Sequence, residues 1–264
     1  MKKLTKFLLI VTSVGSIVWI ATLNPSQFAV TGQPTPTLEP DPNPTTVSAG
    51  PRLIQPKEDI EFRYSLPNGG PGFVRGKCGD LPQVNFTALV PENKIGRTVS
   101  DYPTFFFYLP QPNAELAEFI LEDENGNLIY EQALTIKNLS GVIGVSIPAN
   151  TNLPPLEVGK NYIWKFSLVC DPEDRASDKL ESGVVRRVEL SADILGELEK
   201  ADPRGKTFIY AENGIWQEAL SNLAVARRAN PNDPVLKTDW ESLLDSVSLR
   251  AIAQEPILPI EAQP

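Results

Sequence analysis

The side chains that could do chemistry in this sequence are mainly carboxylates. Four of them stand close together after a hydrophobic run: Asp171, Glu173, Asp174 and Asp178. Hard carboxylate oxygens on one loop could bind Ca²⁺, although their spacing does not match an EF-hand loop. The alternative is a solvated turn that an Asp-Pro pair begins and that Arg175 stabilises by pairing with the acidic side chains. We therefore expect no resident metal or cofactor and keep these four carboxylates as the candidates for one.

Other catalytic signatures are missing from the sequence. The chain has no His, which excludes Ser-His-Asp and Cys-His mechanisms and metal sites ligated by His. Gly205-Lys206-Thr207 imitates the end of a phosphate-binding loop, but the Gly required five positions earlier is Lys200. Neither a Ser-x-x-Lys nor a Gly-x-Ser-x-Gly pattern occurs. We expect a protein that is not an enzyme, and a mechanism that uses two distant carboxylates alone stays open as an alternative.

The charge balance narrows the classes of partner. The chain has 264 residues, which is enough to bury a substantial core. Acidic residues number 33 against 24 basic ones, for a formal net charge of −9. Binding to DNA or RNA depends on a surplus of Lys and Arg that neutralises phosphates. We therefore exclude nucleic acid as the main partner.

The N-terminal residues 1–30 are typical of an export signal. Lys2, Lys3 and Lys6 precede an apolar run over residues 7–23. This run is at the short limit for a membrane span, so both a cleaved signal peptide and an uncleaved N-terminal anchor remain open. Either alternative predicts an exported chain in the periplasm or cell envelope, with the membrane as partner only through this segment.

Residues 31–74 are predicted to form a Pro-rich disordered linker. No aromatic residue occurs between positions 31 and 56. Seven prolines fall in the same stretch: Pro34, Pro36, Pro40, Pro42, Pro44, Pro51 and Pro56. Such a composition favours extended, polyproline-like conformations over a packed core. We also expect a short disordered tail over residues 258–264.

Residues 75–190 have the pattern of an antiparallel β-sandwich, immunoglobulin-like in architecture. Apolar residues recur with a period of two in about seven short runs separated by turn residues. Asn125-Gly126 between two such runs predicts a hairpin, because both residues tolerate a positive φ. The residues predicted to share one face of a later strand are Tyr162, Trp164, Phe166 and Leu168.

The two cysteines, Cys78 and Cys170, are predicted to form a disulfide. Two cysteines in an exported chain most often pair, and Cys170 has the same strand parity as Trp164 and Phe166. A bridge between them would close a loop for which the chain-entropy model gives roughly 4 to 5 kcal/mol. Two free thiols are the alternative.

An unusually aromatic strand is predicted around Phe105, Phe106, Phe107 and Tyr108. In a strand, half of these side chains must point to each face. Burial on both faces, one against the other sheet and one under the C-terminal helices, is the first interpretation. The second is that Phe106 is exposed and belongs to an interface with a partner.

Residues 191–257 change to a helical period and predict an α-helical block. Ser191 caps a first helix that Pro203 ends. Trp216 and Trp240 each begin an i, i+3, i+4, i+7 apolar face on a later helix. One side of this block must cover apolar surface on the sandwich or on a partner, so Trp216 and Trp240 join Phe106 as candidates for partner binding.

Two resemblances follow from particular stretches of the sequence. Residues 210–233 resemble a single tetratricopeptide-like helical hairpin, whereas repeat proteins usually stack three or more units. Four strings together resemble an exported cyanobacterial family known as domain of unknown function 928: TVSDYPTFFFY at 98–108, YIWKFSLVC at 162–170, GIWQEAL at 214–220 and IAQEP at 252–256. The family resemblance implies an envelope location and a joined sandwich-plus-helices unit, and it brings no activity, ligand or catalytic residue.

These expectations combine into an α+β protein, an antiparallel β-sandwich followed by a small C-terminal helical block packed on it. The expected function is that of a non-enzymatic exported cell-envelope protein, a protein-interaction or scaffold module. Its partner would be an unidentified envelope protein or surface component. The alternative is a carbohydrate- or cell-wall-binding module, with or without calcium, which outward Trp or Tyr side chains on the sandwich would favour.

Overall fold

The computed structural model describes residues 50–61, 86–111, 114–149 and 152–259, without the side chains of residues 60 and 61. The predicted signal or anchor, most of the predicted linker, Cys78 and the end of the predicted tail lie outside these residues. Within the described ranges, none of the helices combines the length and the hydrophobicity needed for a membrane crossing.

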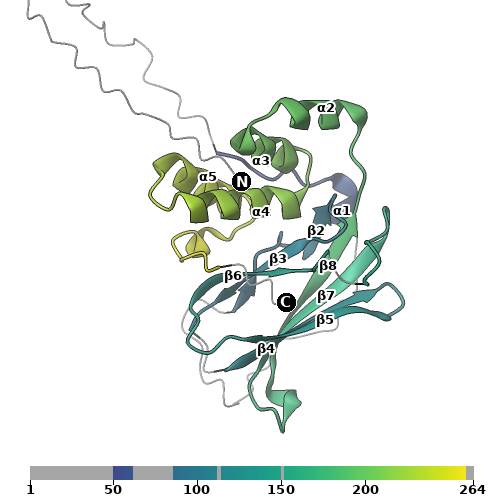
Figure 1. Ribbon diagram of the computed structural model, residues 1–264, viewed down its shortest axis with the longest axis vertical. Helices are drawn as coiled ribbons and strands as arrows, with labels where there is room; N and C mark the ends of the chain where they lie inside the picture. Colours follow the sequence, from purple (N-terminus) through teal and green to yellow (C-terminus); the bar gives the residue numbers. More distant parts are fainter. Residues whose placement is uncertain (1–49, 62–85, 112–113, 150–151, 260–264) are drawn as a thin grey trace, which may run out of the picture. The chain divides into compact units, whose positions relative to one another are not determined.

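Two β-sheets form the central part of the protein (Figure 1). The larger sheet has the strand order β2 (Ile95–Thr98), β8 (Lys179–Arg187), β7 (Asn161–Val169), β4 (Leu116–Asp123) and β5 (Leu128–Thr135). The smaller sheet has the order β1 (Thr87–Ala88), β3 (Thr104–Leu109) and β6 (Gly141–Ser146). A short 3₁₀ turn, η1 (Arg175–Ser177), connects β7 to β8.

The two sheets pack face to face over a first core of buried aromatic and aliphatic side chains. Phe105 and Phe107 enter this core from β3, and Trp164 and Phe166 enter it from β7. The rings of Phe107 and Phe166 stack with centroids 4.0 Å apart. The predicted shared face of β7 is thereby confirmed, because period-2 alternation sends every second side chain to the same side.

The hairpin between β4 and β5 is also confirmed. Gly126 takes a φ of +81°, which a residue without Cβ adopts at little cost. Asp123 stabilises the turn, since its Oδ1 accepts hydrogen bonds from the backbone N–H groups of Asn125 and Asn127, both at 2.8 Å. Local turn chemistry therefore suffices to specify this part of the sheet.

The prediction of a purely antiparallel arrangement is wrong at one edge. β2 pairs parallel to β8, with Ile95 opposite Val184 and Thr98 opposite Arg187. These strands lie far apart in sequence, so no hairpin forces them to run in opposite directions. The immunoglobulin-like architecture stays a prediction.

The part of the chain that follows β8 is helical, as its periodicity indicated. The helices are α2 (Ala192–Lys200), α3 (Pro203–Glu212), α4 (Trp216–Ala229) and α5 (Pro234–Asp245), followed by the 3₁₀ turn η2 (Arg250–Ile252). Ser191 caps α2 as predicted, by accepting a hydrogen bond from the N–H of Ile194. Pro203 does not end α2 but begins α3, where its missing N–H needs no partner.

The helical block covers the outer face of the smaller sheet and creates a second core there. Phe106 and Tyr108 of β3 point into this second core, together with Trp216 of α4 and Trp240 of α5. β3 is thus buried on both faces, as the first interpretation of its aromatic run requires. Figure 1 shows α4 lying over β2 and β3.

The β6 edge of the smaller sheet is covered by the residues that follow η2. The N–H of Val142 in β6 donates to the carbonyl of Pro256, and the N–H of Leu258 donates to the carbonyl of Val142, both at 2.8 Å. Pairing of this kind removes an exposed strand edge that could otherwise recruit another chain.

Candidate functional site

The three residues proposed for partner binding lie inside the protein. Phe106 is 2% exposed, and Trp216 and Trp240 are 0% exposed. All three belong to the second core, so a partner could not touch them unless the helices moved. Their burial corresponds to the alternative in which the apolar face of the helical block covers the protein's own sheet, and not to a surface role for these three residues.

The two tryptophans differ in how their polar atom is treated. The indole N–H of Trp216 donates to the carbonyl oxygen of Leu89 at 2.9 Å. The indole N–H of Trp240 is buried and has no hydrogen-bond partner within the described part of the chain. Trp216 therefore ties α4 to the chain that follows β1, whereas Trp240 contributes through packing.

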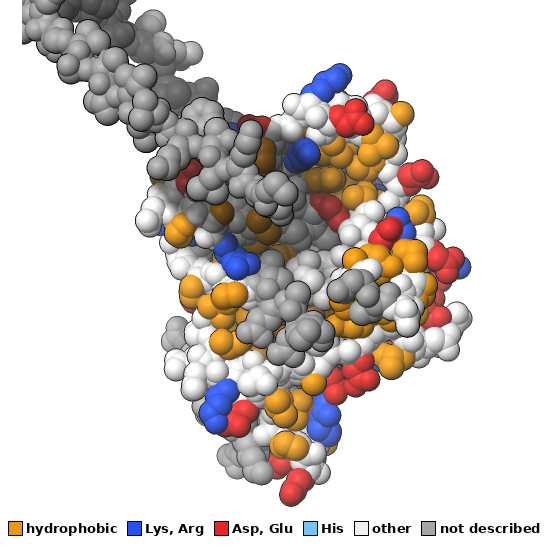
Figure 2. Space-filling view, viewed as in Figure 1, with side chains coloured by type: hydrophobic (Ala, Val, Ile, Leu, Met, Phe, Trp, Pro, Cys, Tyr) orange, Lys and Arg blue, Asp and Glu red, His pale blue; other side chains and the backbone are white. Residues whose placement is uncertain are grey.

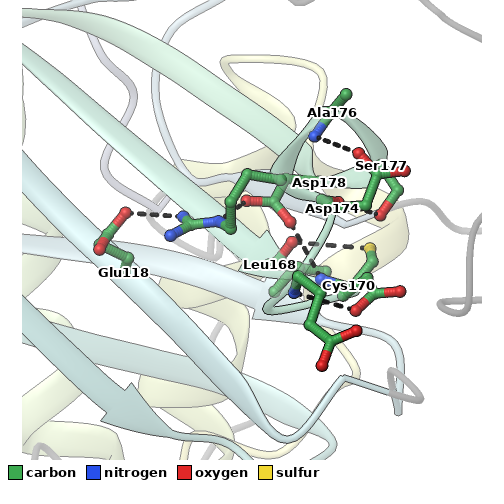
Figure 3. Close-up of polar contacts among 10 residues, drawn as sticks. Glu118, Leu168, Cys170, Asp174, Ala176, Ser177 and Asp178 are labelled. Atoms are coloured by element: carbon green, nitrogen blue, oxygen red, sulfur yellow. Dashed lines mark hydrogen bonds and ion pairs between the residues drawn. The ribbon is translucent and has the colours of Figure 1, made fainter.

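The acidic loop uses its carboxylates internally (Figure 3). Asp178 accepts hydrogen bonds from the Nε of Arg175 at 2.6 Å and from the backbone N–H of Cys170 at 3.1 Å. The same guanidinium donates to Glu118 of β4 at 2.8 Å, so Glu118 and Asp178 converge on one cation. The hydrogen bonds of Glu118 and Asp178 raise the pKa of Arg175.

Two further acidic candidates, Asp174 and Asp171, cap local turns. Asp174 accepts from the N–H of Ala176 at 3.2 Å, and Asp171 accepts from the N–H of Glu173 at 3.1 Å. Over the described ranges, no group of three or more His, Cys, Asp or Glu side chains is placed to hold a metal ion. Asp178 thus acts in an ion pair, and Asp171 and Asp174 act in turns, which are the roles that the sequence offered as the alternative to Ca²⁺. Glu173 takes part through its backbone N–H.

Cys170 follows β7 and is buried at the edge of the first core. Its Sγ lies 3.6 Å from the carbonyl oxygen of Leu168. The parity predicted for this residue is correct, since it shares the core face of Trp164 and Phe166. Cys78 lies outside the described residues, so the pairing of the two cysteines stays a prediction.

A polar site that the sequence analysis missed lies where α4 meets the turn after β2. Glu218, in the first turn of α4, accepts three hydrogen bonds from this turn. The hydroxyl of Thr98 donates at 2.6 Å, and the backbone N–H groups of Val99 and Ser100 donate at 3.2 Å each. A carboxylate that collects two backbone amides fixes both the position and the orientation of the helix.

Burial sets the electrostatics of this site. It raises the pKa of the Glu218 carboxyl, and the hydrogen bonds from Thr98, Val99 and Ser100 only partly oppose that rise. Burial together with the negative charge of Glu218 raises the pKa of Tyr210 on α3. The site is therefore an acid whose proton affinity depends on the helix remaining docked.

A second polar group joins β2 to residues that precede the sheets. Arg97 donates to both carboxylate oxygens of Asp59, at 2.5 and 2.9 Å, and to Glu58 at 2.8 Å. Asp59 is only 4% exposed. Burial acts to lower the pKa of Arg97, but the two carboxylates outweigh it and the pKa rises. A bidentate buried pair of this kind is geometrically specific, and removal of one partner would leave an uncompensated charge.

Residues 50–59, here called the N-terminal strap, are packed against both the helical block and the sheet. The N–H of Leu53 donates to Ser246 Oγ at 3.1 Å, and the N–H of Ile54 donates to the carbonyl of Ala211 at 3.0 Å. The side chain of Gln55 donates to Asn93 at 3.1 Å. α1 (Lys57–Glu61) begins within the strap. Residues 50–59 fall within the stretch predicted to be a Pro-rich linker, and these contacts hold them against the sheet and the helical block.

Gly214, between α3 and α4, lies against the N-terminal strap. In the tetratricopeptide-like interpretation this Gly lets two helices approach. A Cβ at Gly214 would lie 2.7 Å from Cδ of Pro56 and 2.9 Å from the carbonyl oxygen of Ile54. Its φ is +73°, a conformation that favours Gly. The small residue thus admits the strap to the end of α3.

Sequence signals for these contacts were present but ambiguous. Glu218 lies on the helix predicted to begin at Trp216, and an acidic residue on an amphipathic helix usually faces solvent. The strap could not be recognised from the sequence because its prolines are typical of linkers.

A small cavity lined by Leu89, Phe106, Trp164 and Gln217 lies near the first turn of α4, with room for about one water molecule.

Comparison with known proteins identifies the family and adds no activity. The chain matches none of the curated proteins. A family model described as Domain of Unknown Function (DUF928) matches residues 70–257. The match spans both sheets and the helical block, including Thr98 and Glu218, and it excludes the N-terminal strap. By this match over more than half of its length, the chain belongs to the DUF928 family.

Proposed function

We propose that this protein is a non-enzymatic interaction or scaffold module of the cell envelope, and that its partner is an envelope protein or surface component. The N-terminal basic residues and apolar run support export. The main support for the proposal is that acidic side chains bond to other segments of the chain and so hold the fold together. Glu218, Asp59, Glu118 and Asp239 each join two segments of the chain, as expected for a rigid platform.

The helical block offers the surface for the partner. Its inner side is consumed by the second core, but one large aliphatic side chain on each of three helices remains exposed. These are Leu195 of α2 at 48%, Val225 of α4 at 55% and Val235 of α5 at 49%. On the face drawn in Figure 2, hydrophobic side chains gather over α2 and α3, with acidic and basic side chains interspersed. Many protein–protein interfaces are about as apolar as the rest of the protein surface, so a mixed surface of this kind is compatible with a protein partner.

The carbohydrate-binding alternative receives less support. It requires aromatic rings that face outward, on which sugars can stack. The three tryptophans within the described ranges, Trp164, Trp216 and Trp240, are all buried. The acidic loop, which could have bound Ca²⁺ in that alternative, is occupied by Arg175 and by its own backbone amides. We therefore favour a protein partner.

Photo-crosslinking in the native cells tests the proposal. A photoreactive amino acid replaces Val225 or Val235 in the full chain, since both side chains are exposed and neither belongs to the second core. We expect both positions to crosslink to the same envelope protein. The crosslinked product is identified by mass spectrometry.

Two exposed positions outside the helical block, here called the sheet positions, serve as the control. Leu128 and Val158 have similar exposure but lie on the β4–β5 hairpin and on a loop. Crosslinks from the helical positions only would support a partner on the helical block. Crosslinks to wall glycans from the sheet positions, with none to protein from the helices, would overturn the proposal in favour of the carbohydrate-binding alternative.

A further inference from the structure

We propose that the helical block contains a binding site for an extended peptide, and that residues 50–56 of this chain occupy the site in cis. The ligand in trans would be a peptide segment of the partner with the chemistry of the strap, in which a small residue and a proline come before an aliphatic residue two positions further on. This inference deepens the interaction function proposed above and rests on it for the partner's existence. The site itself is argued from contacts within the chain.

The strap is held through its backbone, as peptide ligands commonly are. The N–H of Leu53 donates to Ser246 at the end of α5, and the N–H of Ile54 donates to Ala211 at the end of α3. Consecutive amides are thus bound by two different helices. Contacts of this kind recognise the extended backbone of a peptide, and the side chains of the peptide then determine specificity.

The side chains of the strap alternate in the way expected of an extended ligand. Pro51 is buried, and Leu53 packs against the second core. Between and after them, Arg52 is exposed and Ile54 is 59% exposed. Leu53 is therefore the aliphatic anchor, and alternate positions face away from the helices.

Glycines shape both sides of the contact. A Cβ at Gly50 would lie 2.6 Å from Cβ of Ser242 on α5, so only Gly fits at that end of the strap. On the receiving side, a Cβ at Gly214 would collide with Pro56 and with the Ile54 carbonyl. The strap and the helices are complementary at both ends of residues 50–56.

The two helices that receive the strap are fixed relative to each other. Arg204 of α3 donates to both carboxylate oxygens of Asp239 on α5, at 2.6 and 2.9 Å. Asp239 is fully buried, and Gly50 lies against its backbone. The receiving surface is therefore preorganised, which lowers the entropy cost of binding a peptide.

The strap and its receiving surface are separable parts of the chain. Ala211, Gly214 and Ser246 lie within the family match over residues 70–257, whereas the strap lies outside it. The strap has its own second attachment, through Asp59 to Arg97 on β2, which keeps residues 50–56 at a high local concentration. An incoming peptide must compete with this cis occupant, which makes the strap an internal competitor.

A partner peptide is a better candidate than the strap of a second copy of this chain. Each copy carries a net charge of −9, so two copies repel each other. Sedimentation of the full chain over a range of concentrations tests the second copy directly. A concentration-dependent dimer that Ile54→Pro abolishes would overturn the assignment of the site to a partner.

Titration of a fluorescent peptide of residues 50–61 against the full chain tests the site. Ile54→Pro in the chain removes the N–H that donates to Ala211, and because Ile54 is largely exposed it loses little burial. We expect the peptide to bind this variant about 10-fold or more tightly than it binds the wild type. Ile54→Ala, which keeps the N–H, is the matched control and should behave as the wild type.

Two further measurements test the site without relying on the folding of the Ile54→Pro chain alone. The peptide with its own Ile54→Pro substitution should bind neither chain. In the wild type, excess peptide should speed hydrogen exchange of the chain's Leu53 and Ile54 amides, which needs no variant to fold. Equal peptide binding by folded wild type and Ile54→Pro, together with unchanged exchange, would overturn the inference. None of these results depends on the crosslinking experiment, so the two proposals fail separately.

Discussion

The two cores on either side of β3 are built differently. In the first core the contacts between sheets are ring and aliphatic contacts, such as Phe107 stacked on Phe166 at 4.0 Å. The second core is also apolar at its centre, but Trp216 crosses it with a hydrogen bond to Leu89, and Glu218 binds the turn after β2 at its rim. An apolar centre with a polar rim is the anatomy of a protein–protein interface. The first core thus depends on burial, and the second also depends on directional contacts.

The largest expected effect comes from the first core. Phe107 is 1% exposed and has ring contacts with Phe119, Trp164 and Phe166. Phe107→Ala should lower the free energy of unfolding by about 3–5 kcal/mol, because it removes buried surface and leaves a cavity. Urea unfolding followed by tryptophan fluorescence measures the change. Leu128→Ala on the exposed hairpin is the control, and a loss as small as that control's would contradict a packed first core.

A smaller effect separates directional contact from packing within the second core. Trp216→Phe leaves the carbonyl of Leu89 without its donor, whereas Trp240→Phe removes an N–H that has no partner in the described structure. We expect Trp216→Phe to cost about 1–2 kcal/mol more than Trp240→Phe. Both variants delete the same atoms from fully buried indoles, so each serves as the other's control. Equal losses in urea unfolding would show that the hydrogen bond to Leu89 adds nothing to stability.

The smallest effect is a change in pH dependence. Since the folded state raises the pKa of Glu218 above its ordinary value of 4.5, it binds this proton more tightly than the unfolded chain does. The contribution of Glu218 to the free energy of unfolding therefore falls as the pH rises from 4.5 through the raised pKa. Glu218→Gln should remove this part of the pH dependence. The difference between the wild-type and variant stability curves isolates it, and parallel curves would contradict the assignment.

The sequence predicted the elements whose reasons are local. Period-2 alternation identified the core face of β7, Asn125-Gly126 identified the hairpin, and helical spacing identified α4 and α5. In each case one short stretch contains its own evidence. The aromatic run of β3 was informative for the same reason, because a strand that is apolar on both faces must be buried on both faces.

The remaining features depend on pairs of segments that are distant in sequence. The parallel pairing of β2 with β8, the bond from Thr98 to Glu218 and the docking of the strap each join residues that no local pattern connects. A proline-rich stretch is a linker or a ligand according to what it meets, and composition does not contain that information. For the same reason Phe106, Trp216 and Trp240 were recognised as an apolar surface, but the sequence did not decide whether the protein's own sheet or a partner covers it.

β3 lies early in the chain, and its second cover lies late. Its outer face, with Phe106 and Tyr108, is enclosed only by helices that begin at Trp216. During synthesis on the ribosome this aromatic strand must therefore wait for more than a hundred further residues before it is shielded. Until then its exposed rings make the nascent chain prone to aggregation. We therefore expect a stalled or prematurely terminated product to be bound by chaperones or degraded by proteases.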